Sequence, residues 1–370
     1  MKKVVYCLFL IFFTIVSEVD AKTIHGDYPK DKIISNRMFS LVIPGMLKGT
    51  YEIKKDKITI SVYEKDSLKA GFGGFAFGIR AYKNPKDHAN LPGSKKIGEL
   101  VDKKKNLYDI VLKYPTDVQY DYTKEEPMQY KILYNLGEIV EIKGKEETKY
   151  YKARGTKGED LYQEILEKHI RAIKEKWNTQ KLDEENISNM YSKIANKKNA
   201  LDSIGYVYFD INGDGIDELL IGGITQGMNK GIIYDIYTMA DRKPIHVISS
   251  DTKNRYFTNG YFFIKEYSPS ANENIWLTYI LLDNSNELYP QVGFKQVATI
   301  NKIKKIVKTK TKAKTKAKAK TVTNSTKSSF IMYNFEGGQW EAISERDFSD
   351  RKEPFDKYKR FNFIPLSSYN

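Results

Sequence analysis

Five residues that can offer oxygen atoms lie close together where the sequence reads DINGDGIDE, residues 210–218. Positions 1, 3, 5, 7 and 9 of this stretch are Asp210, Asn212, Asp214, Ile216 and Glu218. Ile216 would contribute its backbone carbonyl, and the glycine at position 6 would allow a sharp turn. Ca2+ takes about six to eight oxygen ligands from such loops. The spacing therefore predicts a structural Ca2+ site.

An acidic turn rich in Asn, Asp and Gly that needs no metal is the alternative for this stretch. Four close carboxylates, which include Asp217, would repel one another without a counter-charge, and this favours the cation. An EF-hand requires a glutamate at position 12 and flanking helices. Position 12 is Ile221, and the flanks at 206–209 and 219–221 have the composition of strands. The loop is therefore predicted to connect two strands.

Two resemblances follow from these residues. The loop resembles the strand–loop–strand calcium loop of FG-GAP and related β-propeller repeats, with Glu218 in place of the usual aspartate. Only one copy is present and a propeller needs several blades, so this resemblance covers a loop and not a fold. A wider pattern resembles a family of uncharacterised exported proteins of host-associated bacteria. This resemblance implies export and architecture but no known activity. The pattern comprises residues 39–44, 71–85, 95–100, 107–123 and 208–222.

The periodicity of apolar residues predicts an α+β chain that positions this loop. Alternating patterns predict an N-terminal β-rich domain over residues 22–150 and an antiparallel β-rich domain over 201–370. Three- and four-residue spacing between them predicts a helical segment over 158–200, with a long helix followed by a shorter one at 183–195. Ser344 and Asp347 form a capping pair that predicts a C-terminal helix.

The N-terminus has the pattern of a secretory signal peptide over residues 1–21. Two lysines precede an apolar run from Val4 to Val16, and small residues before the expected cleavage site end at Ala21. The run has 13 residues, short of the roughly 20 that span a bilayer, and no comparable run follows. The mature chain is therefore expected to have no transmembrane segment and to be secreted or to lie in the periplasm or cell envelope. Its one cysteine, Cys7, would be removed.

Most of the positive charge belongs to one low-complexity insertion, residues 301–329. The net charge is +14, and without the eleven lysines of this segment, which contains no acid, it is +3. Like charges disfavour both helix and strand here, so the composition predicts a mobile loop across 308–320. A polyanion is one partner for such a tract, and an insertion without a partner is the alternative. The lysines concerned are Lys308, Lys310, Lys312, Lys314, Lys316, Lys318 and Lys320.

Residues for catalysis are not apparent. His169 lies on the apolar face of its expected helix, where a hydrogen-bonded core imidazole is favoured over a catalyst. His88 could act as a base, but no nucleophile is tied to it in the sequence. The leading hypothesis is an exported, non-enzymatic protein that binds cell-envelope or host ligands. The alternatives are a polyanion-binding surface protein that acts through the lysine tract and a secreted hydrolase of a wall or host polymer.

Overall fold

The computed structural model describes residues 29–84, 88, 91–144, 148–149, 158–224, 231–258, 263–270, 273–283, 285–308, 320–336, 338–353 and 361–369. The expected signal peptide and the lysines at 310–318 lie outside these residues. The chain divides into two compact units, residues 1–156 and 157–370. Both contain strands and helices, which confirms the α+β class. In the described part of the chain, no helix is both long enough and apolar enough to cross a membrane.

The first unit contains a six-stranded antiparallel sheet and a three-stranded sheet. The larger has the order β3-β4-β5-β7-β6-β9 and the smaller β1-β2-β8. Helix α3 (Met128–Ile139), which sequence reasoning missed, packs against β4 and β5. The strands are β1 (Lys32–Ser35), β2 (Phe39–Ile43), β3 (Tyr51–Lys55), β4 (Thr59–Glu64), β5 (Phe75–Tyr82), β6 (Ser94–Val101), β7 (Leu107–Lys113), β8 (Glu141–Gly144) and β9 (Thr148–Lys149).

The second unit is built on an eleven-stranded antiparallel sheet. Its order is β19-β18-β17-β16-β15-β14-β12-β11-β10-β20, with β13 paired to β12. Neighbours in sequence are mostly neighbours in the sheet, which is the meander that the short connections predict. The strands are β10 (Ile204–Phe209), β11 (Glu218–Gly223), β12 (Ile233–Ala240), β13 (Lys243–Ser249), β14 (Asn254–Thr258), β15 (Phe263–Ser270), β16 (Glu273–Leu281), β17 (Leu288–Lys308), β18 (Lys320–Glu336), β19 (Gln339–Ile343) and β20 (Ile364–Pro365).

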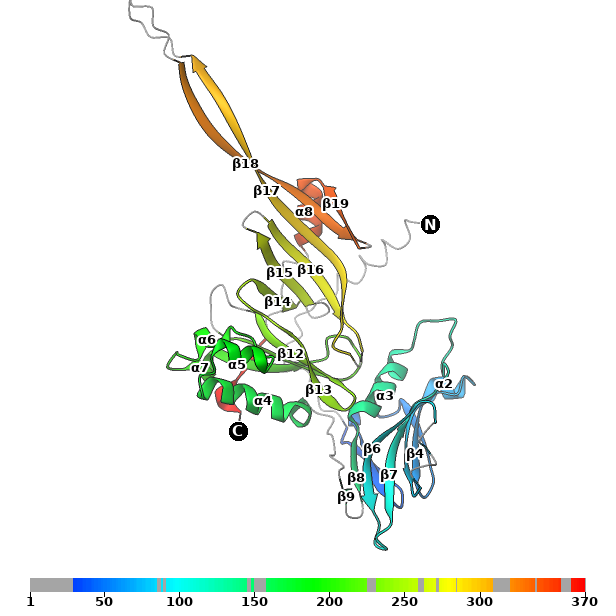
Figure 1. The fold of residues 1–370 in the computed structure, drawn as a ribbon. Helices are drawn as coiled ribbons and strands as arrows, with labels where there is room; N and C mark the ends of the chain where they lie inside the picture. Colours follow the sequence, from blue (N-terminus) through cyan, green and yellow to red (C-terminus); the bar gives the residue numbers. More distant parts are fainter. Residues whose placement is uncertain are drawn as a thin grey trace, which may run out of the picture. The chain divides into compact units, whose positions relative to one another are not determined.

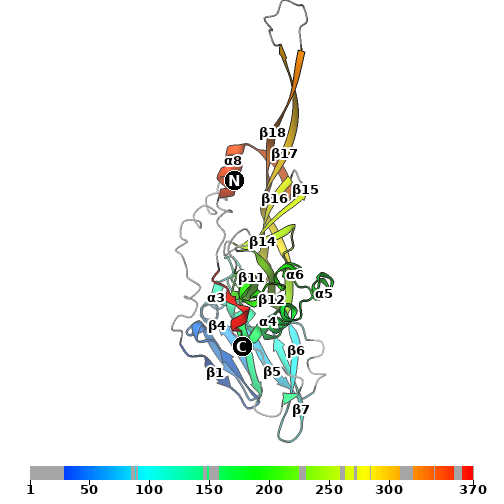
Figure 2. The same ribbon diagram turned by 90° about the vertical axis from the view of Figure 1, so that its left-hand side faces the viewer.

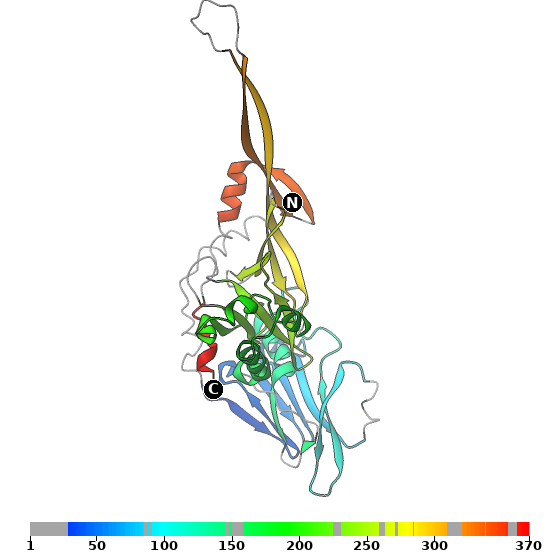
Figure 3. The same ribbon diagram turned by 60° about the vertical axis from the view of Figure 1, so that its left-hand side comes forward.

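The helices of this unit gather in two places (Figure 3). Helix α4 (Gly158–Lys174) contacts β11 and β13, and it is followed by α5 (Thr179–Glu184), α6 (Tyr191–Ile194) and α7 (Ala200–Ser203). The sequence predicts one helix over 183–195, but Asn186 has a φ of 53° and interrupts it. Helix α8 (Glu345–Lys352) packs against β18. Its start is as predicted, because the Asp347 amide donates to Ser344 Oγ at 3.1 Å.

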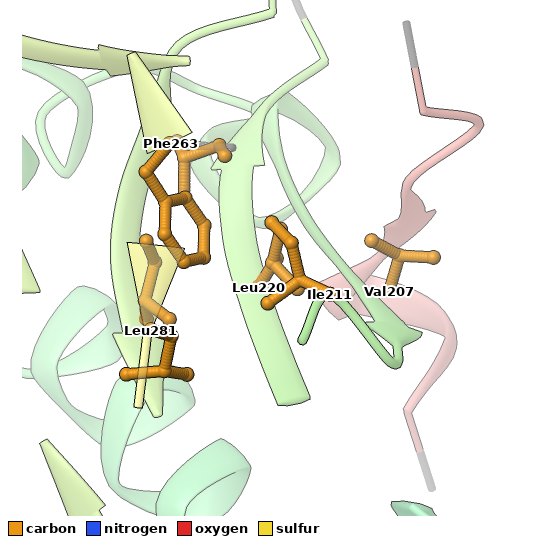
Figure 4. Close-up of a cluster of buried hydrophobic side chains, with 7 residues drawn as sticks. Val207, Ile211, Leu220, Phe263 and Leu281 are labelled. Carbon is orange, nitrogen blue, oxygen red and sulfur yellow. The ribbon is translucent and has the colours of Figure 1, made fainter. Parts of the chain in front are cut away.

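A cluster of buried apolar side chains fixes the sheet where the predicted Ca2+ loop begins (Figure 4). Ile211, inside that loop, is 5% exposed and packs with Val207 and Leu220 of the two flanking strands. Phe263 and Leu281 from β15 and β16 complete the same cluster. The loop is therefore anchored in the core at its first turn.

Strands β17 and β18 extend beyond their other neighbours as a two-stranded ribbon (Figures 1 and 2). Their pairing runs from Gly293 opposite Phe335 to Lys308 opposite Lys320, whereas β16 pairs with β17 only as far as Val297. The loop predicted for 308–320 falls mostly on residues 309–319, which are outside the described part. Residues 301–308 and 320–329 of the expected low-complexity insertion are paired strands, so the prediction of a loop was wrong at its two end residues, Lys308 and Lys320. The β meander extends into the lysine-rich sequence despite its like charges.

Candidate metal centre

The predicted Ca2+ loop connects two paired strands. Strands β10 and β11 are antiparallel, with Phe209 opposite Glu218 as the last pair before the connection. Gly213 and Gly215 have φ values of 70° and 85°, in the left-handed region that glycine adopts without strain. The strand–loop–strand context predicted from the flanks is therefore present, and the glycine at position 6 occupies a tight turn.

Asp210, at position 1, organises the turn through its carboxylate. Its Oδ1 accepts hydrogen bonds from the amides of Gly213 at 2.8 Å and Asp214 at 3.1 Å, and its Oδ2 accepts from Gly215 at 2.9 Å. Asn212, at position 3, donates from Nδ2 to Asp214 Oδ2 at 3.2 Å. The side chains at positions 1, 3 and 5 thus lie on the inside of one turn.

Asp214 and Glu218 are buried carboxylates, with exposures of 2% and 0%. Asp214 Oδ1 accepts from the Ile216 amide at 2.8 Å. Glu218 Oε2 accepts from the Ile211 amide at 2.9 Å, and its Oε1 accepts from Thr238 Oγ1 at 2.9 Å. Buried ionised groups need partners, and these donors offset part of the cost of desolvation.

Electrostatics favour the neutral forms of these two acids. Burial raises the pKa of Asp214 to about 7, and the negative charges of Asp210 and Asp283 act in the same direction. Burial also raises the pKa of Glu218 well above its usual value, with Asp214 as the next cause. A bound cation would lower the cost of ionising these two acids.

Asp283 is a member of this charged group that sequence reasoning missed. It follows β16, far from the loop in sequence, and its charge raises the pKa of Asp214. The spacing of the loop motif contains no signal for such a residue. Three strands separate β16 from β11 in the sheet order, and the buried cluster that Leu281 of β16 shares with Ile211 brings the end of β16 toward the β10–β11 connection.

The far side of the loop is fixed by helix α4. Tyr162, with an exposure of 0%, donates from its hydroxyl to the backbone carbonyl of Asp217 at 2.8 Å. Ile216 is 1% exposed, so its side chain is anchored in the core. The loop has a defined position before any ligand is considered.

The donor set agrees with Ca2+ in its chemistry. Ca2+ binds oxygen ligands from carboxylates, amides and carbonyls, which are the groups that this loop brings together. Among the described residues, no group of three or more His, Cys, Asp and Glu side chains is placed to hold a metal ion. The loop carboxylates instead accept hydrogen bonds from backbone amides. Cation binding would therefore have to compete with, or add to, these hydrogen bonds.

A second buried polar cluster surrounds His169, which is 0% exposed. Its Nδ1 lies 2.7 Å from the Tyr191 hydroxyl and its Nε2 lies 2.9 Å from the Tyr237 hydroxyl. Burial lowers its pKa to about 4, so the imidazole is neutral at pH 7. The prediction of a hydrogen-bonded core histidine is confirmed.

Asp235 lies beside His169 and belongs to a hydrogen-bond chain that sequence reasoning also missed. Ser249 Oγ donates to Asp235 Oδ1 at 2.5 Å and lies 2.9 Å from His246 Nε2. Asp235 Oδ1 accepts from the Ser188 amide as well. In a Ser-His-Asp triad the imidazole lies between serine and carboxylate. Here the serine lies in the middle and donates to the carboxylate, so its oxygen is not activated by histidine.

His88 has partners of its own in the first unit. Its Nε2 lies 2.9 Å from Asp109 Oδ2, and Lys96 Nζ lies 2.7 Å from Asp109 Oδ1. Asp109 is 4% exposed. These contacts give His88 a structural partner on strand β7, a role that the sequence did not indicate.

Comparison of the chain with protein-family models, with curated proteins and with solved structures gave no match in any of the three.

Proposed function

We propose that the chain is an exported, non-enzymatic binding protein in which Ca2+ occupies the 210–218 loop and stabilises the β10–β11 connection. Side-chain oxygens of Asp210, Asn212, Asp214 and Glu218 and the carbonyl of Ile216 are the proposed ligands. The burial of two neighbouring carboxylates is the main support for this proposal. Asp214 and Glu218 are both buried in one hairpin connection, where each raises the cost of ionising the other.

A divalent cation would offset that cost by keeping the carboxylates ionised next to a positive charge. Millimolar calcium outside a cell fills even a weak site, since extracellular modules have Kd values of about 0.1–1 mM. A ligand that binds only the native state with such a Kd stabilises it by about 0.4–1.4 kcal/mol at about 1 mM calcium and by about 1–3 kcal/mol at about 10 mM. For a protein with one cysteine, Cys7, and therefore no internal disulfide, such a site is a source of stability in that environment.

The remainder of the proposal concerns the kind of protein. The signal-peptide pattern and the resemblance to exported proteins of host-associated bacteria support export, and a cell-envelope or host ligand is the corresponding partner class. The polar clusters support a non-enzymatic role over a secreted hydrolase. His169 is held by two tyrosine hydroxyls, and Ser249 donates to a carboxylate rather than to an imidazole.

Equilibrium dialysis against radioactive calcium tests the Ca2+ proposal. We expect the wild-type chain to bind one Ca2+ and Asp214→Asn to bind at least about tenfold more weakly, because a charged ligand is lost. Asp217→Asn is the matched control, since it removes the same charge from the same loop but not a proposed ligand. No bound calcium at about 10 mM, well above the range of extracellular modules, would reject the site. Equal binding by both variants would reject the ligand assignment.

A second candidate function is polyanion binding by the β17–β18 ribbon. The observation that favours it is that this ribbon continues past β16 and leads into the lysines from Lys308 to Lys320. A basic arm of this kind binds phosphate- or sulfate-bearing polymers with an affinity that falls steeply with salt. Deletion of residues 308–320 should therefore lower the salt concentration that elutes the protein from heparin. Unchanged elution would reject this function.

A further inference from the structure

Two adjoining hollows lie on the second unit, on residues that belong to neither the Ca2+ loop nor the lysine-rich ribbon. The first has a volume of about 440 Å³ and lies among α6, β14, β15 and β16. The second has a volume of about 230 Å³ and reaches His246 and Ser249. Asp251 lines both, so the two hollows adjoin there, and together they are here called the Asp251 groove. Its larger part has the size of a small-molecule site.

Three cross-strand neighbours form an ordered row in the larger part. Arg255, Glu266 and Trp276 are opposite one another on β14, β15 and β16. Arg255 Nη2 lies 3.0 Å from Glu266 Oε2, and Trp276 Nε1 donates to Glu266 Oε1 at 3.1 Å. The carboxylate therefore fixes both the guanidinium and the indole before a ligand binds. A pre-organised polar row of this kind reduces the entropy that binding costs.

Most residues of the lining have polar or charged side chains, which restricts the ligand class. Eight of the twelve residues that line the larger part are polar or charged, whereas most sites for drug-like molecules are apolar. Trp276 and Tyr267 add aromatic surface, and Met190 and Ile275 are the apolar remainder. Aromatic surface beside amide, carboxylate and guanidinium groups suits a ligand that has hydroxyl groups and C–H faces. That is the chemistry of a saccharide.

Charge points to an acidic ligand. Lys193 and Lys253 both line the larger part and are exposed, and within the described residues neither ammonium group has an ion-pair partner. The charge of Arg255 is already opposed by Glu266. Asp251 contributes a negative charge to the same lining, so the two lysines leave a net excess of one positive charge in the larger part for a carboxylate or sulfate of the ligand.

The strand pairing argues against an extended peptide as the occupant. Peptides commonly add a strand to an open sheet edge. Strand β15 pairs with β14 and β16, and β16 also pairs with β17, so these two strands beneath the groove have no such edge. We propose that the Asp251 groove binds an acidic oligosaccharide, with Trp276 contacting a sugar ring and Lys193 and Lys253 binding its acidic groups.

Titration of the full chain with three hexasaccharides tests this proposal: chondroitin sulfate, which has sulfate and carboxylate groups, hyaluronan, which has carboxylates only, and neutral chitohexaose. Calorimetry with saturating calcium keeps the Ca2+ loop constant across all titrations. We expect saturable binding of at least one acidic probe and weaker binding of chitohexaose. The difference in affinity between the two acidic probes identifies whether the lysines bind a sulfate or a carboxylate.

Variants separate the groove from other basic surface. We expect Lys193→Gln with Lys253→Gln to weaken the acidic probe about tenfold, the effect of losing charged hydrogen bonds. Lys197→Gln with Lys198→Gln is the matched control, because these exposed lysines are outside the groove lining, and it should leave affinity unchanged. Trp276→Phe, which keeps an aromatic ring against Phe348, should weaken binding less.

Several results would overturn the proposal: no binding of either acidic probe, equal affinity for chitohexaose, or equal affinity in the wild type and the groove double variant. Loss of binding in Lys302→Gln with Lys304→Gln instead would assign the saccharide to the ribbon. Asp214→Asn should retain the acidic probe in this assay. If the Ca2+ site is rejected, saccharide binding at the groove can therefore still be interpreted.

Discussion

Two buried polar clusters in the second unit differ in the partners of their polar side chains. Around His169, a neutral imidazole meets two tyrosine hydroxyls, and Asp235 accepts from Ser249 and a backbone amide. In the 210–218 loop, Asp214 and Glu218 are carboxylates that lie near further carboxylates. An ionised carboxylate can only accept hydrogen bonds, and the loop places several carboxylates close together, whereas Asp235 of the histidine cluster lies beside an imidazole and a serine hydroxyl.

The difference shows which cluster depends on something outside the chain. The histidine cluster combines donors and acceptors around one buried carboxylate, Asp235, whose Oδ2 has no hydrogen-bond partner among the described residues. We expect this cluster to be indifferent to calcium, because Ca2+ takes about six to eight oxygen ligands and Asp235 is a single carboxylate. The loop has amide donors, yet the pKa values of its two buried acids are raised. We therefore expect only the loop to respond to calcium. All three tryptophans, Trp177, Trp276 and Trp340, lie in the second unit, so tryptophan fluorescence follows both clusters without the first unit.

Loss of the imidazole should have the largest effect. His169→Ala opens a cavity, leaves the Tyr191 hydroxyl without its partner and leaves the Tyr237 hydroxyl only the Asn186 carbonyl at 3.3 Å, which should lower the free energy of unfolding by about 4 kcal/mol. Urea unfolding followed by tryptophan fluorescence measures this. The loss should be equal with calcium and with chelator. A loss that calcium reverses would contradict the separation of the two clusters.

Acid should destabilise the second unit through the same histidine. Its pKa is about 4 in the folded protein and near 6.5 when unfolded, so the unfolded state binds the extra proton between these values. Stability should therefore fall as pH decreases from 6.5 to 4, by at most about 3 kcal/mol. The groups that act on His169 are Asp235, Lys168 and His246.

Urea midpoints across this pH range, compared with those of His169→Gln, measure the acid effect. The variant cannot take up the proton, so its stability should depend less on pH. Equal pH dependence in both proteins would show that other groups cause the acid sensitivity.

Neutralising one buried acid should have a smaller effect of opposite sign. In chelator at pH 8, Asp214→Asn should raise the free energy of unfolding by about 1 kcal/mol, because an unfavourable buried charge is removed while the acceptor for the Ile216 amide remains. Asp217→Asn should change it little. Destabilisation by Asp214→Asn in chelator would indicate that its carboxylate is already well satisfied without a cation.

Local sequence patterns predicted those elements of the second unit that are formed by residues close together in the sequence. Alternation predicted the meander, three- and four-residue spacing predicted α4, and glycine with strand-like flanks predicted the hairpin loop. Helix α3 was missed although Tyr130, Leu133 and Leu136 recur at three-residue spacing. Asp283 and the Asp251 groove could not be predicted, because tertiary packing brings together residues that are far apart in the sequence.

The lysine-rich flanks show a limit of composition as a guide. Repulsion between like charges disfavours an isolated strand, but β17 begins at Leu288 as part of the sheet and β18 ends there at Glu336. Extending an existing strand pair costs less free energy than starting a new one, because each added residue pair forms hydrogen bonds next to residues that are already ordered. An argument from local charge alone therefore missed the ribbon.

Thermal unfolding of the second unit in calcium and in chelator tests the central claim most directly. Stabilisation by about 1–3 kcal/mol at about 10 mM calcium should raise the Tm of the wild-type chain by about 3–10 °C, and Asp217→Asn should show the same rise. Asp214→Asn should show almost none. Equal Tm values for the wild type in calcium and in chelator, or an undiminished rise in Asp214→Asn, would contradict the assignment of the 210–218 loop as a Ca2+ site.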